Sequence, residues 1–122
     1  MTLGIVIVSH VAGLAAGVKT LVEQGAADVA ITTAGGTDEG EIGTSVAKIN
    51  AAIESNTADE VLAFYDLGSA KMNLSMAIEM SPKPVHLYDV ALVEGAYTAG
   101  ALLQAGVDLA TVQEQLSQLK IK

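Results

Sequence analysis

The chain has 122 residues, and 51% of them are hydrophobic, which is enough for one domain with a sizeable core. It lacks cysteine, which excludes disulfides and thiolate metal sites, and six lysines, no arginine and fourteen acidic residues give a net charge of −8, which opposes nucleic-acid binding. No run approaches the roughly 18 apolar residues of a membrane span and no basic leader comes first, so we expect a single cytoplasmic domain over residues 1–122 with no membrane partner.

Short apolar runs alternate with longer amphipathic segments, the pattern of βα units on a parallel sheet. The apolar runs predict strands at residues 3–9, 28–33, 60–66 and 85–88. The amphipathic segments predict helices at residues 12–24, 46–55, 69–80, 92–105 and 109–119, and the tail after them carries no signal. We therefore predict a three-layer α/β/α fold with a doubly wound parallel sheet in the strand order 2-1-3-4.

The first predicted strand ends at Ser9 and His10. Its residues 5–8 read Ile-Val-Ile-Val, an uninterrupted run typical of a parallel strand that is buried on both faces. Open α/β sheets bind ligands at the carboxyl ends of their strands, and the helix that starts near Ala12 adds unpaired N–H groups and the positive end of its dipole. An imidazole there suits a phosphoryl group, although the position alone fits equally a histidine that ends the strand in a solvated loop.

Several expectations concern packing away from His10. The helix at 12–24 is expected to bury one stripe, made of Leu14, Val18, Leu21 and Val22. Three methionines recur every four residues and form either an adaptable contact surface or plain core: Met72, Met76 and Met80. His86 lies within the fourth predicted strand and is expected to be a satisfied or edge histidine without a function.

The second informative stretch is the glycine-rich segment 34–45, after the second predicted strand. Its four glycines and three hydroxyl residues lead into a helix, so its N–H groups can curl around an anion. This interpretation places Gly35, Gly36 and Thr37 in a phosphate cradle. The segment contains neither a Walker motif nor GxGxxG, and the alternative is a flexible loop with Thr44 as a helix cap.

The same segment carries three acidic residues, Asp38, Glu39 and Glu41. Their charge disfavours free phosphate or nucleotide at this rim and favours a basic protein partner. Such an acidic insertion can also turn the loop outward, away from His10. Since the chain has no arginine for a bidentate grip, we expect backbone N–H and hydroxyl groups to hold any phosphate, and no lysine to lie beside His10.

The third predicted strand ends in Asp66, followed by Leu67-Gly68-Ser69. If the first and third strands are neighbours, as right-handed crossovers allow, the Asp66 carboxylate can accept the imidazole N–H of His10 and fix its tautomer. The other ring nitrogen is then left as a nucleophile. Ser9 and Ser69 complete the candidate cradle, and this chemistry needs no metal at His10. The alternative is an ordinary strand-end or helix-capping aspartate.

One short motif follows each predicted strand. These motifs are Ser9-His10, Gly35-Gly36-Thr37 with Gly43-Thr44-Ser45, Tyr65-Asp66-Leu67-Gly68-Ser69-Ala70, and Val93-Glu94-Gly95-Ala96. Together they resemble the DhaM family, the phosphotransferase subunits of phosphotransferase-system-dependent dihydroxyacetone kinases, which have the mannose-type enzyme IIA fold. The resemblance covers nearly the whole chain.

This resemblance implies that His10 accepts a phosphoryl group from the carrier protein HPr and passes it to ADP held by the subunit DhaL. That nucleotide then phosphorylates dihydroxyacetone on the subunit DhaK. The resemblance implies no cofactor on this chain, with ADP or ATP and Mg²⁺ on DhaL. It also implies a homodimer, which the low content of charged residues, 16%, favours independently because the helices are rich in apolar residues.

Two other functions stay open at this point. One is a sugar-specific enzyme IIA of the mannose type, with the same chemistry and a transporter component as the acceptor. The other is a non-enzymatic, receiver-like regulatory module phosphorylated on Asp66. The end of the first strand opposes the receiver, because Ser9 and His10 stand where acidic metal ligands would be required.

Overall fold

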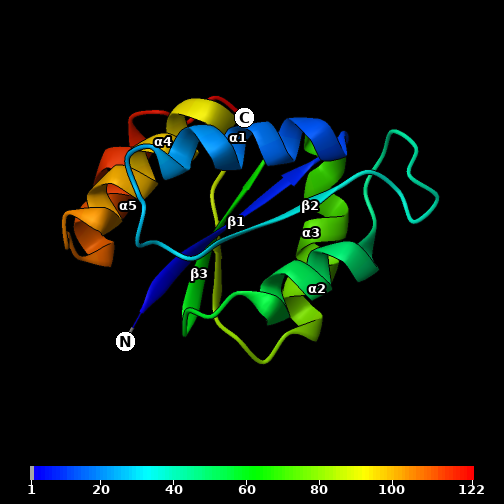
Figure 1. The fold of residues 1–122 in the computed structure, drawn as a ribbon, viewed down its shortest axis with the longest axis horizontal. Helices are drawn as coiled ribbons and strands as arrows, with labels where there is room; N and C mark the ends of the chain where they lie inside the picture. Colours follow the sequence, from blue (N-terminus) through cyan, green and yellow to red (C-terminus); the bar gives the residue numbers. More distant parts are fainter. Residues whose placement is uncertain (1) are drawn as a thin grey trace.

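The structure is a computed structural model that describes residues 2–122, in which strands and helices alternate before a final helical pair (Figure 1). The strands are β1 (Leu3–Ser9), β2 (Ile31–Gly35), β3 (Glu60–Tyr65) and β4 (Val85–Leu87). The helices are α1 (Ala12–Glu23), α2 (Val46–Ser55), α3 (Gly68–Met80), α4 (Leu92–Gln104) and α5 (Leu109–Ser117). None of the helices within the described residues is long and apolar enough to cross a membrane.

The four strands form one parallel sheet in the order β2-β1-β3-β4, which confirms the predicted topology. The register pairs Ser9 with Gly35 on one side of β1 and Val8 with Tyr65 on the other. The strands β2, β1 and β3 therefore end at almost the same level. Each connection that follows starts at the same edge of the sheet, beside His10.

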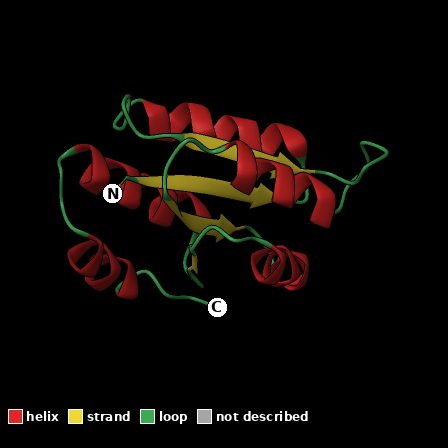
Figure 2. Cartoon of the chain, turned by 90° about the horizontal axis from the view of Figure 1, so that it is seen from below, coloured by secondary structure: helices red, strands yellow, loops and turns green. Residues whose placement is uncertain are grey.

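Side chains of β1 alternate between two separate halves of the core. Ile5 and Ile7 pack with residues of α1, α4 and α5, whereas Val6 and Val8 pack with residues of α2 and α3. In Figure 1, α1 and α4 lie above the sheet, whereas α3 runs down its right-hand side and α2 lies at the lower right. Figure 2 shows the strands side by side with helices on both faces. The central strands are thus buried on both sides, as their apolar runs predict.

Helix α1 departs from the predicted stripe. Leu14 and Leu21 are 45% and 47% exposed, and the buried residues are Ala15, Val18 and Val22. The small Ala15 lets the helix approach the sheet closely, and this turns the helix so that both leucines face away from the core. The prediction that they are buried is wrong.

The second strand begins later and ends later than predicted. Residues 28–30 lie outside β2, and the N–H of Asp28 donates to the side chain of Gln104. At its other end, β2 continues to Gly35 because that residue pairs with Ser9. Other boundaries differ less: β3 ends one residue before Asp66, β4 one residue before Tyr88, and α3 begins one residue before Ser69.

The three methionines at four-residue spacing lie at the surface, and His86 has a side-chain partner. Met72, Met76 and Met80 are 72%, 49% and 65% exposed, so their interpretation as plain core is wrong. The ring of His86 forms a pair with Glu60 at 2.9 Å, which makes it a satisfied histidine within the described structure.

Candidate functional site

His10 follows β1 directly, and its backbone is held on both sides. Its N–H donates to Asp66 Oδ2 at 2.9 Å, and its carbonyl accepts from the N–H of Gly43, also at 2.9 Å. The side chain is 17% exposed. The imidazole is therefore fixed in orientation while one part of the ring faces solvent.

Both ring nitrogens of His10 have a hydrogen-bond partner. Nδ1 lies 2.9 Å from Asp66 Oδ1, and Nε2 lies 2.6 Å from Ser69 Oγ. Because an ionised carboxylate can only accept, Nδ1 carries the proton. In the neutral ring Nε2 then holds a lone pair and accepts from the hydroxyl of Ser69, which leaves Nε2 as the nucleophilic atom.

Asp66 gathers donors from three other residues. Besides His10, Ser9 Oγ donates to its carboxylate at 2.9 Å and the N–H of Leu67 at 2.7 Å. Burial raises the pKa of this carboxyl, but the hydrogen bonds from His10, Leu67 and Ser9 outweigh burial, so the pKa lies below its ordinary value of 3.8. Asp66 therefore stays ionised at neutral pH and can orient the imidazole.

Nε2 faces the start of α3. Ser69 lies in the first turn of this helix and is exposed, and Leu67, the residue before the helix, offers no side chain that caps the turn. The first N–H groups of a helix have no partner within the helix, and they carry its positive dipole end. This geometry suits an anion attached to Nε2, with Ser69 as its nearest hydroxyl.

The glycine-rich loop takes a different course from the predicted cradle. The N–H of Gly36 donates to the carbonyl of Ser9 at 3.3 Å, and the N–H of Thr37 donates to the carbonyl of Glu41 at 2.9 Å. Gly35 lies in β2, where a Cβ would stand 2.6 Å from Ala12 Cα, so its role here is a close approach to α1. These groups lie near His10 but do not point free donors toward it.

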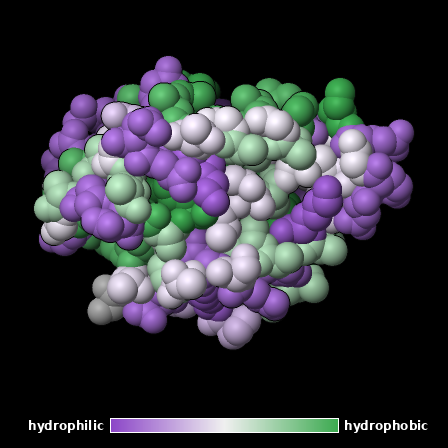
Figure 3. Space-filling model, in the orientation of Figure 1, coloured by the Kyte–Doolittle hydropathy of each residue, from purple (hydrophilic) through white to green (hydrophobic). Residues whose placement is uncertain are grey.

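The tip of this loop projects from the body of the protein, at the right of Figure 1, and forms a hydrophilic projection in Figure 3. Glu39, Glu41 and Ile42 are exposed there, whereas Asp38 accepts a hydrogen bond from Ser45 Oγ. Ser45, rather than Thr44, caps α2 by accepting from the N–H of Lys48.

Two lysines whose position could not be predicted from the sequence lie near this edge of the sheet. Lys122 Nζ donates to the carbonyls of Tyr65 and Asp66, at 2.6 and 2.9 Å, and Lys48 Nζ donates to the carbonyl of Gly35 at 3.2 Å. Neither lysine is a hydrogen-bond partner of His10 within the described residues; both bind backbone carbonyls of the strand ends beside it. No local pattern marks these contacts, since Lys122 lies 56 residues from Asp66 in the chain.

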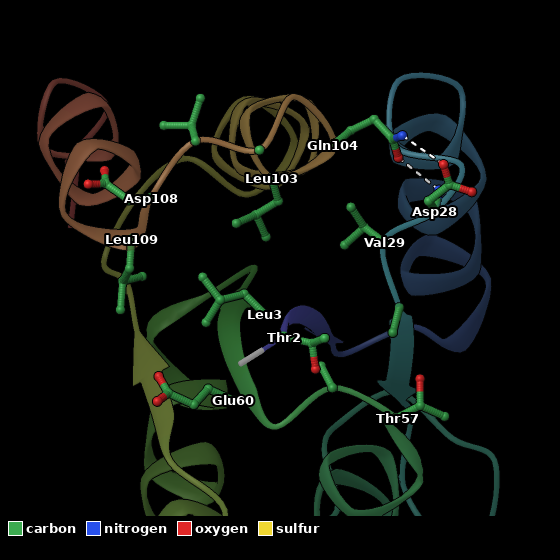
Figure 4. A pocket seen from close by; sticks show the side chains of 14 residues that line it. Thr2, Leu3, Asp28, Val29, Thr57, Glu60, Leu103, Gln104, Asp108 and Leu109 are labelled. Carbon is green, nitrogen blue, oxygen red and sulfur yellow. Dashed lines mark hydrogen bonds between the residues drawn. The ribbon is translucent and has the colours of Figure 1, made fainter.

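A cavity of about 790 Å³ lies at the other edge of the sheet, between the amino ends of β1 and β3 and the connection from α4 to α5. Leu3, Val29 and Leu103 point into it, and Asp28, Glu60 and Asp108 are among its polar residues (Figure 4). Leu3 is the first residue of β1 and His10 follows the last one, so this cavity is separate from the imidazole. Within residues 2–122, no three His, Asp or Glu side chains cluster as metal ligands would.

Known proteins are similar to this chain throughout its length. The sequence profile of the family described as "PTS system fructose IIA component" matches residues 4–113. A relative from Lactococcus lactis subsp. lactis (strain IL1403), named "PTS-dependent dihydroxyacetone kinase, phosphotransferase subunit DhaM", is 48% identical and aligns with 100% of this chain and 99% of its own length. A relative from Listeria innocua serovar 6a, named "PEP-dependent dihydroxyacetone kinase 1, phosphoryl donor subunit DhaM", is 45% identical over 98% of this chain and 96% of its own.

Solved structures agree with this fold. The crystal structure of a protein of unknown function, EF1359, is 32% identical, has a TM-score of 0.87 and covers 100% of this chain and 98% of its own. A sigma-54 interaction domain protein from Enterococcus faecalis is 13% identical with a TM-score of 0.71 over 96% of this chain and 89% of its own, which shows the fold alone. On the family profile and the two full-length relatives, the chain belongs to the mannose-type enzyme IIA family and, within it, to the DhaM group.

Proposed function

We propose that this chain is a phosphohistidine carrier in which His10 Nε2 takes a phosphoryl group from HPr and passes it to ADP on DhaL, for the phosphorylation of dihydroxyacetone on DhaK. The observation that carries the proposal is the two-sided contact of the imidazole. Asp66 holds the proton on Nδ1 while Nε2 faces the uncapped start of α3. The names of the relatives, which describe phosphotransferase or phosphoryl donor subunits of dihydroxyacetone kinases, support the same function.

The transfer step follows from the tautomer. The Nε2 lone pair attacks the phosphorus of the donor, an N–P bond forms, and the bond from phosphorus to the donor's leaving group breaks. The proton stays on Nδ1, and the positive charge that develops on the ring is balanced by the Asp66 carboxylate. In the second half of the cycle ADP attacks the same phosphorus, the N–P bond breaks, and the neutral imidazole returns.

The neighbours of Nε2 have separate parts in this proposal. Ser69 and the first N–H groups of α3 support the equatorial oxygens during transfer. Ser9 is fully buried and donates to Asp66, so it acts through that carboxylate rather than on the phosphate. Gly35, Gly36 and Thr37 remain predicted phosphate ligands, and the N–H groups of Gly36 and Thr37 can take that role only if they give up their present acceptors, the carbonyls of Ser9 and Glu41.

Exposed apolar side chains occur in the segments that adjoin the proposed site. They are Val11 and Leu14 at the start of α1, Ile42 in the glycine-rich loop and Leu67 before α3. Exposed apolar residues close in sequence to the residues that contact His10 fit the docking of HPr and DhaL in turn, with the acidic loop tip steering a basic partner. Nucleotide and Mg²⁺ belong to DhaL in this scheme. We also expect a homodimer, since several other large apolar side chains are exposed, among them Met72, Met80 and Tyr97.

The test is phosphorylation with enzyme I, HPr and phosphoenolpyruvate, followed by mass spectrometry. We expect one acid-labile, base-stable adduct on His10 that disappears when DhaL with ADP, DhaK and dihydroxyacetone are added. A base-labile adduct on Asp66 would indicate the receiver-like module instead. Phosphorylation of a His10→Ala variant would contradict the proposal, and discharge to a sugar transporter component but not to DhaL would favour the sugar-specific alternative.

A further inference from the structure

The edge of the sheet beyond β4 leaves two carbonyls without a strand partner. β4 is short, and its last pair with β3 joins Leu87 to Ala63. The carbonyl of Ala63 accepts from the N–H of Tyr88, and Tyr65, two residues further, faces the same side because strand residues alternate. The carbonyl of Tyr65 therefore needs a donor from outside the sheet, and so does the carbonyl of Asp66, because Asp66 lies just past the end of β3.

The chain after α5 brings a donor to this place. Leu119 accepts from the N–H of Ala91, Lys120 forms an antiparallel bridge with Val90, and the N–H of Ile121 donates to the carbonyl of Asp89 at 3.4 Å. This short pairing carries Lys122 to where a longer β4 would have continued.

Lys122 then satisfies both carbonyls with one ammonium group. Its Nζ lies 2.6 Å from the carbonyl oxygen of Tyr65 and 2.9 Å from that of Asp66, and 4.2 Å from the centre of the Tyr65 ring. Burial lowers the pKa of Lys122, while the charges of Asp66 and Asp89 oppose that shift by favouring its cationic form. The ammonium is thus tied to the backbone of the residue whose carboxylate holds the imidazole.

We propose that Lys122 is a positioning residue of the phosphoryl-transfer site, which fixes the turn from Asp66 to Ser69 and so holds both partners of the His10 ring. The proposal rests on the proposed function. Asp66 and Ser69 are only three residues apart, and they meet Nδ1 and Nε2 respectively. A shift of their shared backbone moves both hydrogen bonds together, and small misplacements of this kind cost transfer rate.

The experiment compares Lys122→Gln and Lys122→Arg with a matched control, Lys120→Gln. The control removes the same charge two residues away, from an ammonium that donates no hydrogen bond within residues 2–122. Single-turnover phosphorylation is measured over a series of phospho-HPr concentrations, which separates the maximal rate from the concentration for half-saturation. Thermal unfolding checks that each variant is folded.

We expect Lys122→Gln to lower the maximal rate about 10-fold with little change in half-saturation, which is less than the ~10²-fold loss typical of groups that act directly on the proton. Lys122→Arg restores the rate to within about 3-fold, because its planar fork can donate to both carbonyls. The control stays within about 2-fold of the unchanged protein. A full maximal rate in Lys122→Gln, or a loss confined to half-saturation, overturns the proposal.

A second measurement does not depend on transfer. Nuclear magnetic resonance of the His10 ring reports the Nδ1–H that is hydrogen-bonded to Asp66, and we expect this signal to broaden in Lys122→Gln but not in Lys120→Gln. An unchanged signal contradicts the positioning role. If the unchanged protein accepts no phosphoryl group from HPr, the proposed function fails, and the ring signal still decides the role of Lys122.

Discussion

Two loops leave the same edge of the sheet, and they make different kinds of contact with His10. The β3–α3 turn directs Asp66 Oδ1 and Ser69 Oγ at the two ring nitrogens. The glycine-rich β2–α2 loop donates instead to the backbone beside the ring, from the N–H of Gly36 to Ser9 and from the N–H of Gly43 to His10. The first loop supplies side-chain chemistry, whereas the second fixes the backbone and projects its acidic tip outward.

In this structure the N–H groups of Gly36, Thr37 and Gly43 donate to backbone carbonyls, so the glycine and hydroxyl content of the loop does not by itself indicate free donors for a phosphate. The N–H of Thr37 already donates within the loop, to the carbonyl of Glu41, while the Thr37 hydroxyl accepts from the N–H of Glu41. A donor that already has an acceptor gains little from an anion, whereas the open first turn of α3 loses nothing by binding one. The contrast between the loops can be tested by removing side chains from each.

The largest effect is expected for Asp66→Ala. The imidazole loses the acceptor that holds the proton on Nδ1, and the ring loses its orientation. Orienting and acid–base groups contribute about 10²- to 10⁴-fold, and we expect a loss of about 10²-fold in the rate of phosphorylation by HPr. Rapid-quench kinetics measure it. Unchanged rates would show that Asp66 takes no part in transfer. The contrast between the β3–α3 turn and the glycine-rich loop would then lose its main support.

Ser69→Ala is expected to have the next largest effect. Nε2 loses its hydroxyl partner at 2.6 Å, and the phosphoryl oxygens lose a donor. We expect transfer to slow about 10-fold, in line with the loss of one hydrogen bond to a charged group. The matched variant on the other loop is Thr37→Ala, for which we expect a change below about 2-fold. The opposite order of the two variants would restore the glycine-rich loop as the cradle.

Charge reversal at the loop tip gives a smaller effect of another kind. Replacing Asp38, Glu39 and Glu41 with Lys removes the negative potential that steers a basic partner, so phosphorylation by HPr slows about 3-fold or more at low salt. Raising the salt concentration should slow the unchanged protein in the same way, because exposed charges are screened. Light scattering should still report a homodimer. Transfer that responds to neither change contradicts the steering role, and a monomer at micromolar concentration contradicts the dimer.

The smallest effect concerns stability in acid. The pKa of Asp66 is below its ordinary value of 3.8 in the folded protein, so its ionised carboxylate stabilises the fold. This contribution to the free energy of unfolding is fully present above pH 3.8 and is lost as the pH falls through the folded-state pKa. Urea unfolding between about pH 5 and about pH 2 should therefore show a steeper loss of stability for the unchanged protein than for Asp66→Asn. Equal slopes would show that the carboxylate gains nothing from its donors in the folded state.

The fold and the pairing of His10 with Asp66 could be predicted because both depend on sequence patterns and on a topological rule that do not require the details of side-chain packing. Apolar runs locate the central strands, and crossover handedness places β1 beside β3, which brings both residues to one edge. The ends of β2 and the facing of Leu14 could not be predicted, since they depend on how closely Ala15 and Gly35 let α1 approach the sheet. The sequence also does not show which acceptor a loop N–H will find, and Lys122 reaches its carbonyls across 56 residues without a local signal.

The β2–α2 loop is fixed at both ends and exposed at its tip, so the tip can be replaced on its own. Its two stems are anchored to the backbone of Ser9 and His10 by the N–H groups of Gly36 and Gly43, and the tip between them is exposed. Residues at the tip can therefore be grafted from one carrier onto another without moving the imidazole. Under the proposed function, partner preference and transfer chemistry therefore belong to separate parts of the chain, so one can be redesigned while the other is kept.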